Sequence, residues 1–401
     1  MARQRSAPPA RPRIGLALAG GGPLAAIYEI GALCALEEAI AGLDLTRCDG
    51  YIGVSAGGFI AAGLANGLTP RQLCAAFIEN SAAAPDNFAP SLMLRPAWEE
   101  YGARLRSLPG LIGQALWQTG VQGRPLLAAC ERLGRALPTG LLSGEALAAQ
   151  LRRQFSQPGR SDDFRQLKKT LVLVATDLDS GQAVPFGTPG WDHVPISRAV
   201  QASAALPGLF APVEIDGRHY VDGALKKTVH ASVLLDRGLD LLICLNPLVP
   251  HQTGHDEQAR ITRLSDGGLP LVMSQTLRAL IHSRLELGLK RYALSHPGTD
   301  ILLFEPDPRD AEMFLANTFS YSRRRHLAEH AYQATRAALL RRRAHLGPQL
   351  QRQGLTLDLE VLRDPQRRLL AEPATPAART DRALQRLHAT LDRLEAQRLA
   401  A

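Results

Sequence analysis

Residues 13–40 read RIGLALAGGGPLAAIYEIGALCALEEAI. The apolar run from Ile14 to Ala19 has the length and composition of a buried strand, and three glycines follow it directly. From about residue 24 to residue 40, apolar side chains such as Ile27 and Ile30 recur at helical spacing. A strand, a glycine turn and a helix in this order are typical of the first unit of a parallel sheet that is covered by helices.

The same alternation continues along the chain. It predicts a three-layer α/β fold in which a central, mostly parallel sheet is flanked by helices. Asp216 and Gly217 separate two strand-like runs, which is a strong signal for a hairpin, and a second helical pattern begins at Ala56. Further strands are expected at Tyr51–Val54, Lys169–Thr176, Leu209–Ile215, Arg218–Val221, Leu239–Leu245 and Asp300–Phe304, and amphipathic helices at residues 270–293 and 311–344.

The chain of 401 residues is long enough for one large α/β domain, which we place at residues 14–345. Within it, residues 70–165 are helical and loop-like with several proline and glycine breaks, so we expect them to form a cap or insertion over a site. Residues 1–13 carry four arginines and no acid, and we expect a disordered basic tail there. Residues 346–401 are expected to form a helical C-terminal appendage.

Composition argues against several classes of protein. No apolar stretch approaches the roughly 20 residues that a membrane-spanning helix needs, and the N-terminus lacks the apolar segment of a secretory signal. The five cysteines are widely spaced among apolar residues, which favours reduced core thiols and a cytoplasmic protein, although export without a signal stays open. No Cys/His cluster suggests a metal, so we expect neither a metal nor another cofactor.

The formal net charge of +8 is concentrated at the ends of the chain, and residues 260–401 hold 23 basic and 15 acidic side chains. Such an excess fits contact with an anionic membrane surface, or arginine-rich helix faces in solvent. We favour solvated faces, because arginine is frequent throughout the chain, and keep peripheral membrane contact as an alternative. Nucleic acid is not expected as a partner.

Gly20, Gly21 and Gly22 are suited to form an oxyanion hole, because glycines let backbone N–H groups point outward at the N-terminus of a helix. The same stretch also fits the dinucleotide fingerprint G-x-G-x-x-G/A, with Ala25 at its last position. That interpretation needs an acidic residue at the end of the second strand, where the sequence has Ser55. The oxyanion interpretation is therefore favoured.

Ser55 lies in the sequence Gly53-Val54-Ser55-Ala56-Gly57, a G-x-S-x-G motif between an expected strand and an expected helix. Small flanking residues are what a strained turn needs if it is to expose a serine hydroxyl as a nucleophile. In α/β-hydrolases several strands precede this turn, whereas here only one does, so we expect Ser55 beside the glycines of the first unit. The alternative is a serine that only caps the next helix.

Asp222 is the candidate base for this serine. It is followed by Gly223 and Ala224 and comes at the end of the second hairpin strand, at the edge where catalytic side chains of open α/β sheets gather. A base is needed because a neutral serine hydroxyl is a weak nucleophile. Histidine is the commoner base, but the eleven histidines here have no motif context, and only His219 and His230 are kept as alternatives.

Together these features resemble the patatin family of lipid acyl hydrolases. The resemblance runs from about residue 14 to 248, more weakly to about 340, and includes ATDLDSG at residues 175–181 and ASAALPGLF at residues 202–210. It implies a Ser55–Asp222 dyad without histidine, and an oxyanion hole at the three glycines. Many members have a basic residue shortly after the glycines, where this chain has Pro-Leu-Ala, so the resemblance carries over no phosphate-binding basic residue at that place.

The function implied by the resemblance is that of a serine lipid acyl hydrolase, which cleaves carboxylic esters of phospholipids or lysophospholipids through an acyl-serine intermediate. Two alternatives stay open. The same residues would also support acyl transfer to an acceptor other than water. A catalytically inactive protein that binds anionic membranes through its basic ends is the other alternative.

Overall fold

The computed structural model describes residues 11–82, 86–88, 90–120, 136–225, 230–253, 263–315 and 323–370. One compact unit runs as far as Arg367, and the residues from Arg368 onward form a second unit. Most of the expected basic tail lies outside the described residues, and so do residues 371–401, the larger part of the expected appendage. Both expectations stay predictions.

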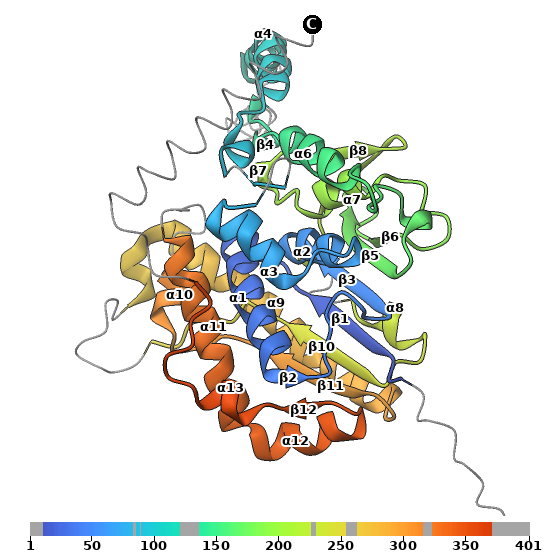
Figure 1. The fold of residues 1–401 in the computed structure, drawn as a ribbon. Coiled ribbons are helices and arrows are strands. Elements are labelled where there is room, and N and C mark those ends of the chain that lie inside the picture. The colour runs from blue at the N-terminus through green and yellow to red at the C-terminus, as the bar shows by residue number, and fades with distance from the viewer. Residues whose placement is uncertain are drawn as a thin grey trace, which may run out of the picture. The chain divides into compact units, whose positions relative to one another are not determined.

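The core of the compact unit is a sheet of eight described strands (Figure 1). They are β1 (Ile14–Leu18), β3 (Gly50–Val54), β5 (Thr170–Asp177), β6 (Ala183–Phe186), β8 (Val213–Ile215), β9 (Arg218–Asp222), β10 (Leu241–Leu245) and β11 (Asp300–Phe304). Neighbouring strands follow the order β11-β10-β1-β3-β5-β9-β8, and β6 pairs with β5 off this path. Pairs from β11 to β5 are parallel, whereas β9, β8 and β6 pair antiparallel, so the sheet is mostly parallel, as predicted.

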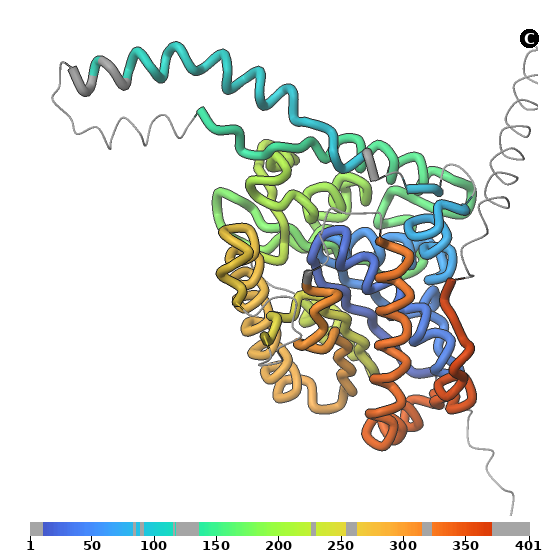
Figure 2. The backbone as a smooth tube through the Cα atoms, turned by 90° about the vertical axis from the view of Figure 1, so that its left-hand side faces the viewer, coloured from blue at the N-terminus to red at the C-terminus, as the bar shows by residue number. Residues whose placement is uncertain are grey.

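Helices cover both faces of the sheet, because its strands are apolar on both sides. Every residue of β1, β3 and β10 is buried. One face carries α1 (Gly22–Ala39) and α2 (Ala56–Ala65), with α11 (Arg324–Arg341) packed on α1. The other carries α8 (Ser232–Leu235) and α9 (Gly268–Ser295), whose Ile281 and Leu285 join the hydrophobic cluster of that face. Figure 2 shows α9 and α11 on opposite sides of the sheet. The predicted three layers, helices, sheet and helices, are therefore confirmed.

The predicted hairpin is present, with β8 and β9 joined by Asp216 and Gly217. Both turn residues have positive φ, 52° and 74°, as in the tight turns that Asp-Gly favours between strands. The expected first strand over Leu209–Ile215 is wrong in its extent. It breaks at Pro212, which has no N–H to donate to a neighbouring strand, and its first part is a separate strand, β7 (Gly208–Phe210).

The described parts of residues 70–165 are mainly helical, as expected from their sequence. They contain α3 (Pro70–Leu73), the π-helix η1 (Cys74–Glu79), the 3-10 helices η2 (Pro90–Leu94) and η4 (Phe164–Gln166), α4 (Trp98–Gly120), β4 (Gly140–Leu142) and α6 (Glu145–Phe155). β4 pairs with β7, and α6 packs against α7 (Ile196–Ser203). This region is therefore joined to the chain segment that leads into the hairpin.

The helix expected over residues 311–344 is divided. Its described parts are α10 (Ala311–Leu315), α11 and α12 (Arg343–Arg352), and residues 316–322 lie outside the described residues. After α12, β12 (Thr356–Leu357) pairs antiparallel with β2 (Ile40–Ala41), and α13 (Leu359–Arg363) packs against α11. The compact unit thus continues past residue 345, where we placed the end of the α/β domain.

Four of the five cysteines lie in the described residues and are buried without a disulfide, as predicted: Cys34, Cys48, Cys74 and Cys244. Cys130 lies outside those residues. None of the described helices combines the length and the apolar character that crossing a bilayer requires.

Candidate active site

Ser55 occupies a sharp turn between β3 and α2. Its φ of 54° and ψ of −121° lie outside the regions that L-residues ordinarily adopt, so the turn is strained. Close backbone contacts explain the two motif glycines. A Cβ atom at Gly57 would lie 2.5 Å from the carbonyl oxygens of Leu18 and Ala19, and one at Gly53 would lie 2.5 Å from the Gly57 carbonyl oxygen. The G-x-S-x-G spacing therefore reflects steric exclusion of side chains around the serine.

We expect Gly57→Ala to lower the free energy of unfolding by about 1–3 kcal/mol, because the added methyl group has to displace backbone. Urea unfolding of the purified variant measures this change. Gly102→Ala is the matched control, since a Cβ at Gly102 in α4 meets nothing within 4 Å and alanine is the better helix former. A Gly57→Ala protein as stable as the Gly102→Ala protein would contradict the steric explanation.

Ser203, to which we assigned no role from the sequence, holds the turn in place. Its buried side chain accepts a hydrogen bond of 2.8 Å from the Ser55 N–H and donates one of 2.6 Å to the Val174 carbonyl oxygen. Ser203 is 148 residues from Ser55 in the chain, so no local pattern connects the two. The signal that could have found it is the segment at residues 202–210, which resembles patatin-family sequences.

Asp222 is the last residue of β9 and is 3% exposed. It pairs with Ala175 of β5, and β5 is the neighbour of β3, the strand that leads into Ser55. The Ser55 side chain is close enough to the Asp222 carboxylate to lower its pKa, and the carboxylate accepts a hydrogen bond of 2.8 Å from the Ala224 N–H. The fold thus brings the two candidate residues to the wall of one cavity.

The direction of the strand that carries Asp222 differs from the expected one. We expected it at the carboxyl edge of the sheet, where parallel strands end, but β9 runs antiparallel to β5. β9 therefore enters the sheet at that edge, level with Asp177 at the end of β5, and reaches Asp222 two residues later. The Asp222 side chain lies near the carboxyl edge of the parallel strands because β9 starts at that edge and has only five residues.

Burial raises the pKa of the Asp222 carboxyl group to about 6, and the nearby Ser55 side chain and the hydrogen bond from the Ala224 N–H offset part of that rise. The group is ionised at neutral pH, yet it holds a proton more tightly than an exposed aspartate. A carboxylate with this pKa is better matched to proton transfer near neutral pH than an ordinary one.

Gly20, Gly21 and Gly22 form the glycine loop, which connects β1 with α1 beside the serine. β1 and β3 are adjacent strands, as we expected, and a Cβ at Gly20 would lie 2.9 Å from the Ser55 Cβ. α1 begins at Gly22 without a side-chain cap, so its first N–H groups and the helix dipole give positive potential next to the serine. Pro23 suits the first turn of this helix, because it has no N–H that needs an acceptor.

The dinucleotide alternative lacks its acidic residue. Ser55 follows β3 at the end that faces the glycine loop. Asp49 lies at the opposite end of β3, where its carboxylate accepts a hydrogen bond of 2.9 Å from the Ile14 N–H. The geometry therefore favours the oxyanion interpretation of the glycines.

Ser55 and Asp222 line a cavity of about 350 Å³, which we call the catalytic cavity. Its walls are mainly apolar. Phe59, Phe77 and Phe88 pack together on one side, with ring centroids 4.9–5.6 Å apart. Other lining residues include Met93, Leu147, Leu206, Phe210, Leu277 and Ile281. Several of these come from residues 70–165, the region expected to form a cap, so the cavity is suited to an acyl chain.

No histidine is among the described residues that line this cavity. His219 is exposed, and it points to the other face of β9 from Asp222, because alternate residues of a strand face opposite ways. His193 bonds to Asp216 at 2.8 Å near the surface, which leaves Asp216 as a residue of the hairpin turn.

Across the described residues, no group of three or more His, Cys, Asp or Glu side chains is placed to hold a metal ion.

Comparison with known proteins gives one family match. A family model described as "Patatin-like phospholipase" matches residues 16–235. Relatives from Mycobacterium bovis and Mycobacterium tuberculosis, each named an uncharacterized NTE family protein, are 35% identical over 83 residues, which are 21% of this chain. The match spans 22% of those relatives, or about a fifth of their length.

Solved structures that are similar to this chain include VipD and ExoU. VipD from Legionella pneumophila is 16% identical with a TM-score of 0.34, over 80% of this chain and 68% of that chain. ExoU, a type III effector protein of Pseudomonas aeruginosa, is 19% identical with a TM-score of 0.35, over 83% of this chain and 54% of that chain.

Proposed function

The chain belongs to the patatin-like phospholipase family, whose model matches residues 16–235, and on this premise we propose that it hydrolyses carboxylic esters of acyl lipids. Ser55 is the nucleophile, Asp222 is its general base, and the glycine loop is the oxyanion hole. One observation carries the proposal: a serine at a strained turn and a buried carboxylate line the same apolar cavity.

In the acylation step, Asp222 accepts the proton of the Ser55 hydroxyl while the oxygen attacks the carbonyl carbon of the ester. The carbonyl oxygen becomes an oxyanion, which the N–H groups of the glycine loop and the N-terminus of α1 stabilise. When the tetrahedral intermediate collapses, the ester C–O bond breaks and the proton passes from Asp222 to the departing alkoxide. The products are acyl-Ser55 and an alcohol.

In the deacylation step, a water molecule gives a proton to Asp222 and attacks the acyl carbon. The second tetrahedral intermediate releases the fatty acid, and Ser55 recovers its proton from Asp222. Water is the only other reactant, so the balance of both steps requires no cofactor. The substrate that fits is an acyl lipid, a phospholipid or a lysophospholipid, with its acyl chain among the phenylalanine and leucine side chains of the catalytic cavity.

The direct test is release of free fatty acid from a phospholipid and from a lysophospholipid by the purified protein. We expect release from at least one of them, together with turnover of a short-chain ester. Acyl groups recovered only as esters of an added alcohol would instead identify an acyltransferase. Liposome binding without any turnover would favour the inactive membrane-binding alternative.

We expect kcat/KM for a neutral short-chain ester to fall as the pH drops below about 6, because Asp222 acts as a base only when it is ionised and burial raises its pKa to about 6. The fall should approach tenfold for each further pH unit. Rates between pH 4.5 and 8, with circular dichroism at each pH to show that the protein stays folded, measure this profile. A plateau that extends to pH 5 would contradict it.

Peripheral contact with an anionic membrane surface is the second part of the proposal. Leu280, Leu287 and Leu294 of α9 recur every seven residues and are 56%, 64% and 84% exposed. Arg291 is exposed on the same side of the helix, and Met273, two turns before Leu280, is exposed and also lines the catalytic cavity. An apolar row flanked by basic residues is typical of helices that lie in a lipid interface.

We expect Leu280→Glu combined with Leu287→Glu to weaken binding to vesicles of anionic phospholipid by about tenfold or more, because two apolar contacts become repelled charges. Cosedimentation with vesicles measures binding. Turnover of a soluble short-chain ester should be retained, since neither leucine lines the catalytic cavity. The control pair Gln182→Glu with Gln351→Glu adds the same charge at exposed sites outside α9. Equal vesicle binding by both pairs would argue against this surface.

A further inference from the structure

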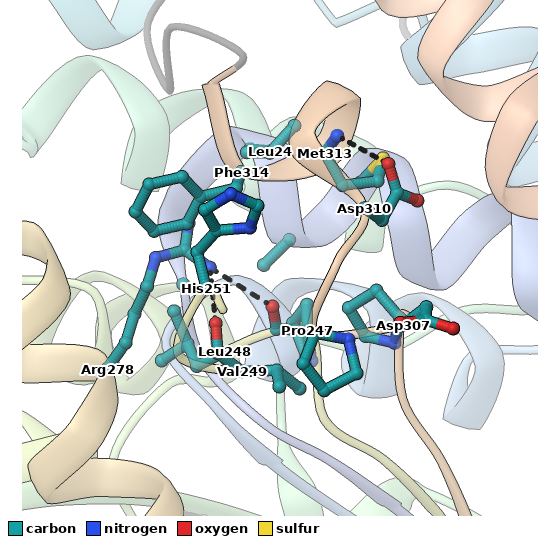
Figure 3. Close-up of a pocket in the computed structure, with 14 residues that line it drawn as sticks. Leu24, Pro247, Leu248, Val249, His251, Arg278, Asp307, Asp310, Met313 and Phe314 are labelled. Carbon is teal, nitrogen blue, oxygen red and sulfur yellow. Dashed lines mark hydrogen bonds between the residues drawn. The ribbon is translucent and has the colours of Figure 1, made fainter. Parts of the chain in front are cut away.

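Arg278 is a buried cation between two cavities. It lies on α9, is 8% exposed and lines the catalytic cavity. It also lines a neighbouring cavity of about 20 Å³, which Figure 3 shows. Gly21 and Leu248 line the same two cavities. The arginine therefore sits beside the glycine loop, in the cavity that holds Ser55.

Within the described residues, Arg278 has no ion pair with an acid. Its Nη1 donates to the carbonyl oxygens of Pro247 and Val249 at 3.5 and 3.4 Å, which is longer than a normal hydrogen bond (Figure 3). Its guanidinium carbon lies 5.2 Å from the centroid of the Phe314 ring. Burial lowers the pKa of this side chain, but an arginine stays protonated in proteins. The charge is thus desolvated with little in the structure to compensate it.

Asp222 is not the missing partner. Both groups line the catalytic cavity, but no ion pair joins them, and the Asp222 carboxylate accepts a hydrogen bond of 2.8 Å from the Ala224 N–H instead. The two charges are therefore separate features of one cavity. Arg278 is left available for an anion that enters it.

The loop at residues 247–251 has a better anchor than Arg278. Gln275, one turn earlier on α9, donates from Nε2 to the His251 carbonyl oxygen at 2.9 Å and accepts from the His251 N–H at 3.0 Å. The His251 ring also stacks on Phe314, with centroids 4.6 Å apart. The long bonds of Arg278 add little to this attachment, so holding the loop does not explain a buried cation.

We propose that Arg278 binds the phosphate group of a phospholipid or lysophospholipid while its ester lies at Ser55. The inference rests on the proposed function and names the group that recognises its substrate. Guanidinium groups bind phosphate through two parallel hydrogen bonds. The phosphate has to approach from the catalytic cavity, because the neighbouring cavity of about 20 Å³ has room for about one water molecule.

Arg278 also supplies a charge that the glycine loop lacks. The three residues that follow its glycines are Pro23, Leu24 and Ala25, none of which carries a charge. Arg278 lies outside the matched residues 16–235, yet it shares both cavities with Gly21. Its helix is firmly placed, because Ile281, one turn later, packs in the same hydrophobic cluster as Ala224.

The test compares lysophosphatidylcholine with an uncharged 1-monoacylglycerol of the same acyl chain, both in micelles of one nonionic detergent. We expect Arg278→Gln to lower the ratio of kcat/KM for the lysophospholipid to kcat/KM for the monoacylglycerol by about 10- to 100-fold, because a charge-assisted hydrogen-bonded pair is lost. Arg278→Lys keeps the charge without the planar fork, so its ratio should fall less. Arg363→Gln removes an exposed arginine of α13 and should keep the wild-type ratio.

An unchanged ratio in Arg278→Gln would overturn the inference, and so would an equal fall for both substrates, which indicates a structural role. Fluorophosphonate labelling of Ser55 shows whether each variant has a folded site, and Arg278→Lys carries the test if Arg278→Gln does not fold. Inorganic phosphate that changes monoacylglycerol turnover in the wild type but not in Arg278→Gln would identify a regulatory anion site, and the inference would be wrong. If the wild type cleaves neither ester, the proposed function itself fails.

Discussion

Ser55→Ala is expected to lower turnover of a short-chain ester by at least about 10⁴-fold. The change removes the hydroxyl group that lines the same cavity as the Asp222 carboxylate, and with it the atom that forms the acyl intermediate. The turn itself should persist, because Ser203 holds it through the Ser55 backbone N–H rather than through the side chain. The oxyanion hole and the cavity are retained, so a small residual rate above that of water is expected.

Labelling with a fluorophosphonate, followed by mapping of the modified peptide, tests the same residue without a substrate. The label should appear on Ser55 in the wild type and be absent from Ser55→Ala. Ser156→Ala, which changes an exposed serine after α6, is the matched control and should be labelled and active. A label on another serine, or substantial turnover by Ser55→Ala, would show that the nucleophile is misassigned.

The parts of the fold that could be predicted are those whose cause is local. β1, the glycine loop and α1 follow one another within residues 14–39, so composition and spacing show them directly. The hairpin turn was predictable for the same reason, because Asp216 and Gly217 adopt positive φ at little cost. The break at Pro212 could also have been predicted from the sequence, but we predicted one continuous strand over Leu209–Ile215.

The parts that could not be predicted depend on contacts between distant segments. No pattern within β9 shows that it runs antiparallel to β5, since strand direction is set by the partner strand and the connection. The role of Ser203 does not follow from its neighbours in the chain, although its segment resembles the patatin family, and Arg278 carries no local signal. One acts on a backbone N–H far away in the chain, and the other becomes notable only because α9 buries it beside the glycine loop. Burial of a polar group is a property of the packed molecule.

Asp222→Asn is expected to lower kcat for the short-chain ester by about 10³- to 10⁴-fold. An amide of the same shape keeps an oxygen that can accept from the Ala224 N–H, but it cannot take the proton of Ser55. Without that transfer the serine attacks as a neutral hydroxyl, which is a weak nucleophile. Rates at pH 7.5 measure the loss, and the residual activity of the variant should show no step near pH 6.

The stability of Asp222→Asn to urea shows whether the variant loses activity because it lacks the base or because it is unfolded. The folded pKa of Asp222 is raised to about 6, so the native protein favours the protonated carboxyl group and stability falls as the pH rises from about 4 to 6. Above pH 6 the ionised, buried carboxylate costs about 3 kcal/mol. Asparagine has no charge to bury, so at pH 7.5 the variant should unfold in urea at a concentration equal to or above that for the wild type.

Two further variants decide whether Asp222 is the base. Asp216→Asn makes the same change in the other Asp-Gly pair of the hairpin, at a turn position with positive φ that asparagine tolerates, and should retain wild-type turnover. His230→Ala should also stay active, since His230 is not among the residues that line the catalytic cavity. If His230→Ala is as inactive as Asp222→Asn while both remain folded, the proton passes through the imidazole and the dyad is wrong.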